Sequence, residues 1–264
     1  MKKYLVIGNP IKHSLSPKLH NYWIKQNNID AIYEKKKINE KDIRELILEI
    51  KKENLNGMNI TVPFKKIVTS FLDDLTDAAR KTQSVNTVFK REGKAIGDNT
   101  DIGGFEAGIK NTKYKIQNKK IFILGAGGVV PSIIFALRNL GVSEIILSNR
   151  TKKKSEDIKK LYPELKVLNW GEIPNFDIII NATSIGLKKK EKIELNLINI
   201  GKDKLFYDVI YNPSMTNFLI EGKKLGNKVE NGKMMFIYQA QLAFKIWHNI
   251  LPKIDEETIS LLNT

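Results

Sequence analysis

The stretch Ile121-Phe122-Ile123-Leu124-Gly125-Ala126-Gly127-Gly128 decides the fold of the second half of this chain. Four consecutive apolar residues predict a strand that is buried on both faces, and a helix-period segment follows the glycines. Gly125 permits a tight turn there, and Gly127 lets the backbone approach a pyrophosphate at the N-terminus of the next helix. An ordinary strand-to-helix turn is the alternative. The flanking strand and helix favour a dinucleotide-binding loop.

The residues after the next strand indicate which dinucleotide is bound. An NAD site would place an acidic residue there to hold the ribose 2′-hydroxyl, whereas this chain has Asn149-Arg150-Thr151 and then Lys154. Arg150 and Lys154 suit a 2′-phosphate, and Thr151 offers a hydroxyl. A surface arginine beside a threonine that caps the following helix is the alternative. The pattern favours NADP.

Apolar runs that alternate with helix-period segments predict an α/β protein with parallel sheets. Residues from about 119 to 230 form a doubly wound pattern, and residues from about 1 to 100 form a separate α/β unit. Ala240, Ala243, Phe244, Trp247 and Leu251 fall on one helical stripe near the end. We expect this helix to return to the first unit and to leave a ligand-binding cleft between two domains. The expected strands are 4–7, 58–62, 85–89, 121–124, 145–147, 178–180 and 205–209.

Composition excludes several classes of protein. The 264 residues contain no cysteine, and so no disulfide framework or thiolate metal site is expected. No apolar run is long enough to cross a bilayer, and we expect a cytoplasmic protein without a membrane partner. The net charge of +15 raises nucleic-acid binding as an alternative. The lysine clusters 35–37, 152–154 and 188–190 lack interleaved aromatics, which favours solvated surface lysines instead. A positive field would still attract a small anionic substrate.

A series of short motifs runs in one order along nearly the whole chain. They are 8–17 (GNPIKHSLSP), 59–65 (NITVPFK), 85–87 (VNT), 99–101 (NTD), 181–186 (NATSIG), 208–213 (DVIYNP) and 238–240 (YQA). In this order they resemble the shikimate dehydrogenase family. The resemblance implies reversible hydride transfer between NADP and C3 of shikimate, with 3-dehydroshikimate as the ketone, in aromatic amino acid biosynthesis. It implies a monomer or homodimer that binds a small-molecule substrate, without metal or nucleic acid.

The resemblance also implies a division into two domains. Residues 1–104 plus 238–264 would form an N-terminal α/β substrate domain that is closed by the C-terminal helices. Residues 105–237 would form a doubly wound, Rossmann-type NADP domain, with the active site in the cleft between the two.

Lys65 and Asp101 match the family's acid/base pair. Lys65 follows Pro63 near an expected helix start, where the helix dipole and partial burial both disfavour a charged ammonium and a nearby carboxylate opposes them. Such a lysine can exchange a proton with a substrate oxygen. A solvated lysine is the alternative, and we expect the neighbouring Lys66 to be one. Asp101 would orient Lys65, cap a helix that begins near Ile102, or do both.

The remaining candidates are also carried over from the family's motifs. Ser16 has a plain N-cap as its alternative, with Pro17 at the first helical position. Asn86 is unusual in the middle of an expected strand. Asp77 has a helix-surface acid as its alternative. The substrate-binding candidates are Ser14, Ser16, Asn59, Thr61, Asn86, Tyr211 and Gln239. The cofactor-binding candidates are Asp77, Gly125, Ala126, Gly127, Gly128, Val129, Asn149, Arg150, Thr151, Lys154, Thr183, Val209 and Gly232.

The chain departs from the family pattern at a few positions. Gln83-Ser84 stand where Gly-Ala is usual, Val130 stands at the third glycine of the loop, and Pro131 stands where an arginine is usual. These departures concern loop shape. Two alternatives within the same fold are a quinate/shikimate dehydrogenase with relaxed cofactor use and a nonenzymatic NADP-binding regulator. Arg150 argues against the first, and the intact Lys65/Asp101 pair argues against the second.

Overall fold

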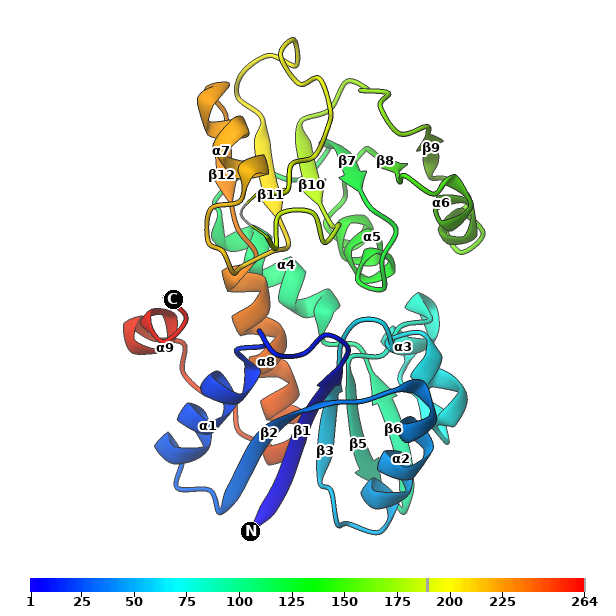
Figure 1. The fold of residues 1–264 in the computed structure, drawn as a ribbon, viewed down its shortest axis with the longest axis vertical. Helices are drawn as coiled ribbons and strands as arrows, with labels where there is room; N and C mark the ends of the chain where they lie inside the picture. Colours follow the sequence, from blue (N-terminus) through cyan, green and yellow to red (C-terminus); the bar gives the residue numbers. More distant parts are fainter. Residues whose placement is uncertain (189, 264) are drawn as a thin grey trace. The chain divides into compact units, whose positions relative to one another are not determined.

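The computed structural model describes residues 1–188 and 190–263 and divides into two compact units (Figure 1). Unit 1 comprises Met1–Gly104 and Ile237–Asn263, and unit 2 comprises Phe105–Phe236. Lys189 of the third lysine cluster and Thr264 at the end of the expected substrate domain lie outside the described residues. No helix in the described ranges has the length and apolar character that a membrane span needs.

Unit 1 is built on a mixed sheet with the strand order β2-β1-β3-β5-β6-β4. β1 is parallel to β2 and β3, and β4 is parallel to β6, whereas β5 is antiparallel to both β3 and β6. The strands are β1 (Lys2–Gly8), β2 (Ala31–Lys37), β3 (Gly57–Ile60), β4 (Asp74–Leu75), β5 (Thr87–Arg91) and β6 (Lys94–Asp98).

Unit 1 therefore departs from the predicted parallel sheets at one strand, β5. The reason lies at Glu92-Gly93, where both residues have positive φ, 51° and 77°. A two-residue turn of this kind joins antiparallel neighbours, here β5 and β6.

Helices cover both faces of this sheet, because successive strand residues point to opposite sides. Leu5 and Ile7 of β1 pack in the cluster that holds the apolar face of α2. Tyr4 points to the other side, where its ring lies 5.0 Å from that of Trp247 in α8. The helices of unit 1 are α1 (Ser16–Gln26), α2 (Ile43–Lys51), α3 (Asp77–Thr82), α4 (Asp101–Asn111, which runs on into unit 2), α8 (Lys233–His248, which begins in unit 2) and α9 (Glu256–Ser260), with short turns at η1 (Glu40–Asp42) and η2 (Ile67–Phe71).

Three sequence expectations about element bounds need correction. β3 ends at Ile60 rather than Val62, since Pro63 has no N–H to donate and the chain turns through the Phe64 N–H to Thr61 carbonyl bond of 3.0 Å. β5 begins at Thr87, and so Asn86 lies just before the strand rather than inside it. α8 ends at His248, which leaves Leu251 outside the helical stripe and 56% exposed.

Unit 2 carries a six-stranded sheet in which every pair is parallel, as the apolar runs predicted. Its order is β12-β11-β10-β7-β8-β9, and the chain changes direction between the neighbours β7 and β10. Ligands bind beyond the carboxyl ends of the strands at such a switch point. The strands are β7 (Lys120–Leu124), β8 (Glu144–Ser148), β9 (Lys166–Leu168), β10 (Ile178–Asn181), β11 (Leu205–Asp208) and β12 (Lys228–Glu230); the helices are α5 (Val130–Asn139), α6 (Lys152–Lys159) and α7 (Asn217–Lys224).

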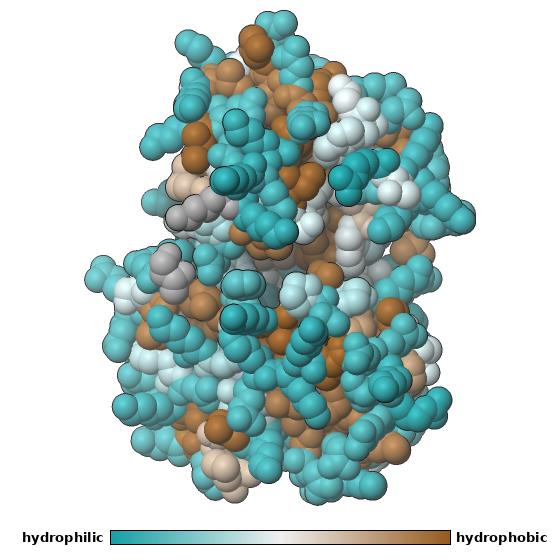
Figure 2. Space-filling view, viewed as in Figure 1, coloured by the Kyte–Doolittle hydropathy of each residue, from teal (hydrophilic) through white to brown (hydrophobic). Residues whose placement is uncertain are grey.

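Hydrophilic side chains cover most of the face drawn in Figure 2. The lysines of the clusters 35–37 and 152–154 are all exposed.

Candidate functional site

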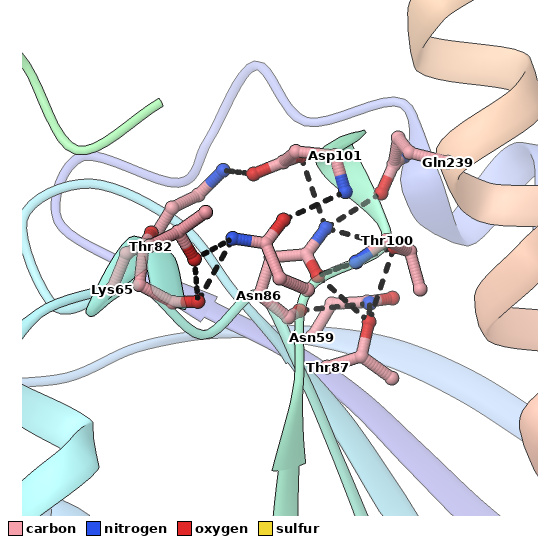
Figure 3. A network of polar contacts seen from close by, with 10 residues as sticks. Asn59, Lys65, Thr82, Asn86, Thr87, Thr100, Asp101 and Gln239 are labelled. Carbon is pink, nitrogen blue, oxygen red and sulfur yellow. Dashed lines mark hydrogen bonds and ion pairs between the residues drawn. The ribbon is translucent and has the colours of Figure 1, made fainter. Parts of the chain in front are cut away.

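Lys65 and Asp101 form a buried ion pair in unit 1. Lys65 Nζ lies 2.5 Å from Asp101 Oδ2, and the two residues are 9% and 4% exposed (Figure 3). The segment after β3 carries Lys65, and its carbonyl accepts a hydrogen bond of 2.9 Å from the Val85 N–H. Asp101 is the first residue of α4, so the helix begins one position earlier than expected. The pair gives unit 1 a proton donor and an anion side by side.

Asn86 connects this pair to the neighbouring polar side chains (Figure 3). Its Nδ2 donates to Asp101 Oδ1 at 3.0 Å, to Thr100 Oγ1 at 2.9 Å and to Gln239 Oε1 at 3.3 Å. Its Oδ1 accepts the Thr100 N–H at 2.7 Å. The orientation of the Asn86 amide is therefore fixed, with its amino group toward the carboxylate that holds Lys65.

Asn59 extends the same network on the strand side. Its Nδ2 donates to the Asn86 carbonyl at 3.0 Å and to Thr87 Oγ1 at 3.1 Å. Its Oδ1 accepts a hydrogen bond of 2.6 Å from the Tyr33 hydroxyl. Sequence reasoning named neither Thr87 nor Tyr33. Thr87 and Thr100 lie in the motifs 85–87 and 99–101 and could have been predicted as site residues. Tyr33 lies in no motif.

Ser14 and Ser16 lie together at the start of α1. The Ser14 hydroxyl donates to Ser16 Oγ at 3.2 Å and accepts the Ser16 N–H at 3.3 Å. Ser16 is the first residue of the helix and Leu15 holds the cap position, so the N-cap reading of Ser16 is wrong. Thr61 lies beside Gly8, where a Cβ would meet the Thr61 methyl group at 2.5 Å.

The glycine loop of unit 2 follows β7 as the sequence predicted. Gly125 has a φ of +108°, and a Cβ there would lie 2.8 Å from the Ala182 carbonyl oxygen. Gly127 is exposed, and its nearest neighbour would be the same oxygen at 3.8 Å, an ordinary contact. The fold itself therefore requires glycine at 125 but not at 127. α5 begins at Val130, with Val129 in the cap position and no side-chain cap bond.

Basic residues gather after β8. Arg150 is exposed, and Lys152, Lys153 and Lys154 occupy the first turn of α6 without an acidic residue among them. Thr151 holds the cap position of α6, but its side chain makes no capping bond, which removes the capping role as the reason for this threonine. Lysines at the positive end of a helix dipole are unfavourable by themselves, so this turn suits an anion.

A second polar network lies at the carboxyl ends of β10 and β11. Asn181 pairs in register with Asp208, and its Nδ2 lies 3.1 Å from each carboxylate oxygen. Thr183 donates to Asn181 Oδ1 through its N–H at 3.0 Å and its hydroxyl at 2.7 Å. Burial raises the pKa of Asp208 to about 6, against hydrogen bonds from Thr216, Ile210 and Asn181 that lower it. Sequence reasoning placed Thr183 here but missed Asn181 and Asp208 as site residues.

The structure distributes the candidates between the two units. Lys65, Asp101, Asn86, Asn59 and Gln239 come together in one network of unit 1. Tyr211, a substrate-binding candidate, lies in unit 2, where its ring stacks on that of Phe236 with centroids 4.2 Å apart. Asp77, expected with the cofactor residues, lies in unit 1, exposed in the first turn of α3. Gly232 packs directly on the backbone of Val209 in unit 2.

Comparisons with known proteins point to one family. The family model described as the shikimate dehydrogenase substrate binding domain matches residues 6–88, and the model described as shikimate / quinate 5-dehydrogenase matches residues 108–210. A protein from Pelagibacter ubique named shikimate dehydrogenase (NADP(+)) is 58% identical over 99% of both chains.

Solved structures agree with the sequence comparison. Shikimate dehydrogenase from Aquifex aeolicus is similar with a TM-score of 0.91 at 35% identity, covering 99% of this chain and 97% of its own. The enzyme from Thermus thermophilus, solved in complex with NADP(H) and shikimate, is similar with a TM-score of 0.89 at 29% identity, covering 100% of this chain and 98% of its own.

Proposed function

The chain belongs to the shikimate dehydrogenase family, and on that premise we propose that it interconverts shikimate and 3-dehydroshikimate with NADP, using Lys65 and Asp101 as its acid/base pair. The buried ion pair with a separation of 2.5 Å is the observation that supports this assignment most directly. Burying a lysine and a carboxylate costs desolvation free energy, and functional sites are where such groups gather.

The residues of unit 2 fit a phosphorylated dinucleotide. Gly127 is exposed, and none of the described residues lies close enough to it to require a glycine. An exposed glycine of this kind leaves the backbone free to approach a pyrophosphate. Arg150 and the first turn of α6 supply positive charge for a 2′-phosphate, and Thr151 supplies a hydroxyl. When bound, the reduced cofactor would supply the hydride for ketone reduction, and the oxidised cofactor would accept it in alcohol oxidation. Thr183, Val209 and Gly232 would lie along the nicotinamide side of the site.

The residues of unit 1 account for the proton. In ketone reduction the Lys65 ammonium donates its proton to the developing C3 oxygen, and in alcohol oxidation the neutral amine accepts it. Asp101 holds the amine in place at 2.5 Å. Asn86 donates to the other oxygen of Asp101 and keeps that carboxylate from turning. Ser14, Ser16, Asn59, Thr61 and Gln239 would hold the carboxylate and the other hydroxyls of shikimate.

Initial rates with the purified chain test the reaction. We expect turnover with NADP and shikimate, and rates at least tenfold lower when NAD replaces NADP or quinate replaces shikimate. Equal rates with quinate or NAD would instead indicate a quinate/shikimate dehydrogenase with relaxed cofactor use. No turnover with any of the four pairs would overturn the proposal and favour a nonenzymatic regulator.

Replacing one of two adjacent lysines tests the acid/base assignment. Lys65→Met removes the proton donor from the buried pair, so kcat should fall by about 10²- to 10⁴-fold. Lys66→Met is the matched control, because Lys66 is exposed and we expect its kcat to stay within about twofold of the wild type. A Lys65→Met protein with wild-type kcat would contradict the assignment while leaving the reaction itself intact.

A further inference from the structure

The carboxylate of Asp208 is buried in unit 2 and accepts hydrogen bonds from neutral donors. Asn181 Nδ2 lies 3.1 Å from both oxygens, the Ile210 N–H lies 2.9 Å from Oδ1, and the Thr216 hydroxyl lies 2.6 Å from Oδ2. The residue is 0% exposed. Among the residues that the structure describes, the donors to this carboxylate are all neutral, and a buried carboxylate held in this way is expensive in free energy, so stability alone is a poor explanation for it. Its acceptor-only character is what sets it apart from an amide or a hydroxyl.

That character contributes to the orientation of Asn181. A carboxylate can only accept, so Asn181 turns its amino group toward Asp208 and its Oδ1 away from it; the Ile185 carbonyl accepts from the same amino group at 3.1 Å. The Asn181 Oδ1 then receives both the N–H and the hydroxyl of Thr183, at 3.0 and 2.7 Å. The Thr183 hydroxyl in turn accepts the Ile185 N–H at 3.0 Å. Asp208 therefore fixes Thr183 through one intermediate side chain.

A second arm leads from Asp208 to Val209. The Ile210 N–H that Asp208 accepts lies one residue beyond Val209, and the Ile210 carbonyl accepts the Gly232 N–H at 3.1 Å. Gly232 also packs on the Val209 backbone. One carboxylate thus ties together the segments that carry Thr183, Val209 and Gly232.

We propose that Asp208 is a positioning residue for the dinucleotide, acting through Asn181 on Thr183 and through Ile210 on Val209. The inference rests on the proposed function, because Thr183 and Val209 matter to the cofactor only if this edge of the sheet holds one. Asp208 itself neither donates a proton to the substrate nor accepts one from it.

Asp208→Asn is the direct test because it keeps the shape and changes one acceptor into a donor. The new amino group can face the Thr216 hydroxyl, which can rotate to accept, but it also faces the Asn181 amino group. Asn181 then flips to offer its Oδ1 to residue 208, and its amino group meets the N–H of Thr183. We expect the dissociation constant for NADP, measured by titration calorimetry without substrate, to rise at least tenfold.

Tyr207→Phe is the matched control on the same strand. The Tyr207 hydroxyl is buried and makes no hydrogen bond within the part of the chain that the structure describes, so removing it leaves the Asp208 network in place. Its dissociation constant for NADP should stay within about twofold of the wild type. Thermal melting of the apo proteins separates loss of binding from loss of folding.

The double variant Asn181→Asp with Asp208→Asn provides a rescue. Here the amide introduced at position 208 donates to the new carboxylate at position 181, which again accepts both donors of Thr183 but no longer donates to the Ile185 carbonyl. We expect NADP affinity within about fivefold of the wild type, far from the sum of two independent losses. The double variant also serves if Asp208→Asn alone does not fold.

The outcomes separate the two proposals. A wild-type chain that does not bind NADP would overturn the proposed function. If the wild type binds and a folded Asp208→Asn protein binds equally well, the positioning role fails while the function stands. A folded double variant that binds NADP no more tightly than a folded Asp208→Asn protein would also overturn the positioning role, because the restored acceptor should have held Thr183.

Discussion

The hydroxyl of Tyr33 donates a hydrogen bond of 2.6 Å to Asn59 Oδ1, and both residues are buried. Tyr33 lies in β2 and Asn59 in β3, on either side of β1, which pairs Tyr4 with Tyr33 and Val6 with Asn59. The sheet register thus brings together residues that are 26 positions apart in the sequence. Because Asn59 Nδ2 is already committed to Asn86 and Thr87, Tyr33 completes the fixation of that amide.

Removing the Tyr33 hydroxyl should weaken substrate binding more than catalysis. Tyr33→Phe loses one hydrogen bond, about 1 kcal/mol, and lets the Asn59 amide turn. We expect KM for shikimate to rise about three- to tenfold with kcat within about twofold. Tyr4→Phe, in the same aromatic cluster, is the control and should keep the wild-type KM. An unchanged KM in Tyr33→Phe would show that Asn59 does not need this support.

The sequence predicted the strands of unit 2 well because buried parallel strands are continuous apolar runs. It missed β2, whose last four residues, 34–37, are exposed and charged, as suits the edge of a sheet. It also missed β6, because its sequence Lys-Ala-Ile-Gly-Asp has charged ends and a glycine and so lacks a continuous apolar run. β9 and β12 have three residues each and lie at sheet edges, where the apolar signal is weakest.

From the sequence, only residues that lie in the family's motifs could be assigned to the site. Composition and periodicity do not distinguish Lys65 from Lys66, and only the motif that ends at Lys65 selected the one that the structure buries. The roles of Tyr33 and Asp208 could not be predicted from the sequence for a physical reason. They depend on strand register and on which neighbour accepts a hydrogen bond, and the local sequence determines neither.

Acid should destabilise the protein through His20. Burial, together with a smaller electrostatic contribution from His248, lowers the pKa of His20 to about 3. Between about pH 3 and pH 6.5, His20 is protonated in the unfolded chain but neutral in the folded chain. The folded state therefore loses stability as the pH falls through this window. The expected contribution is a slope of about 1.4 kcal/mol per pH unit.

Urea unfolding at several pH values between 4 and 6 measures this slope. His20→Phe keeps a flat ring against Tyr33, on which His20 stacks at 4.2 Å, and removes the titrating group. Its free energy of unfolding should depend on pH less steeply than that of the wild type. His13→Gln is the control, because His13 is exposed and its replacement should leave the slope unchanged. Parallel curves for the wild type and His20→Phe would contradict the prediction.

Two glycines of the same loop should respond differently to alanine. Gly125→Ala places a Cβ 2.8 Å from the Ala182 carbonyl oxygen at a φ of +108°, so we expect a loss of stability of about 1–3 kcal/mol or more. Gly127→Ala meets only an ordinary contact at 3.8 Å and should fold with a melting temperature near that of the wild type. If Gly127 faces the pyrophosphate, the dissociation constant of the Gly127→Ala protein for NADP should nevertheless rise at least tenfold. Wild-type NADP affinity in Gly127→Ala would remove this residue from the cofactor site.

Arg150 should determine the preference for NADP over NAD. Its guanidinium is exposed after β8, and a 2′-phosphate offers it a charge-assisted, bidentate partner that the 2′-hydroxyl of NAD does not. Arg150→Ala should raise KM for NADP by about 10- to 100-fold, equivalent to about 1.4–2.7 kcal/mol, and leave KM for NAD within about twofold. Arg138→Ala, another exposed arginine of unit 2 that pairs with Glu164 at 3.1 Å, is the control and should change neither value. An equal rise in KM for NADP and for NAD would mean that Arg150 supports the conformation of the loop rather than binding the 2′-phosphate.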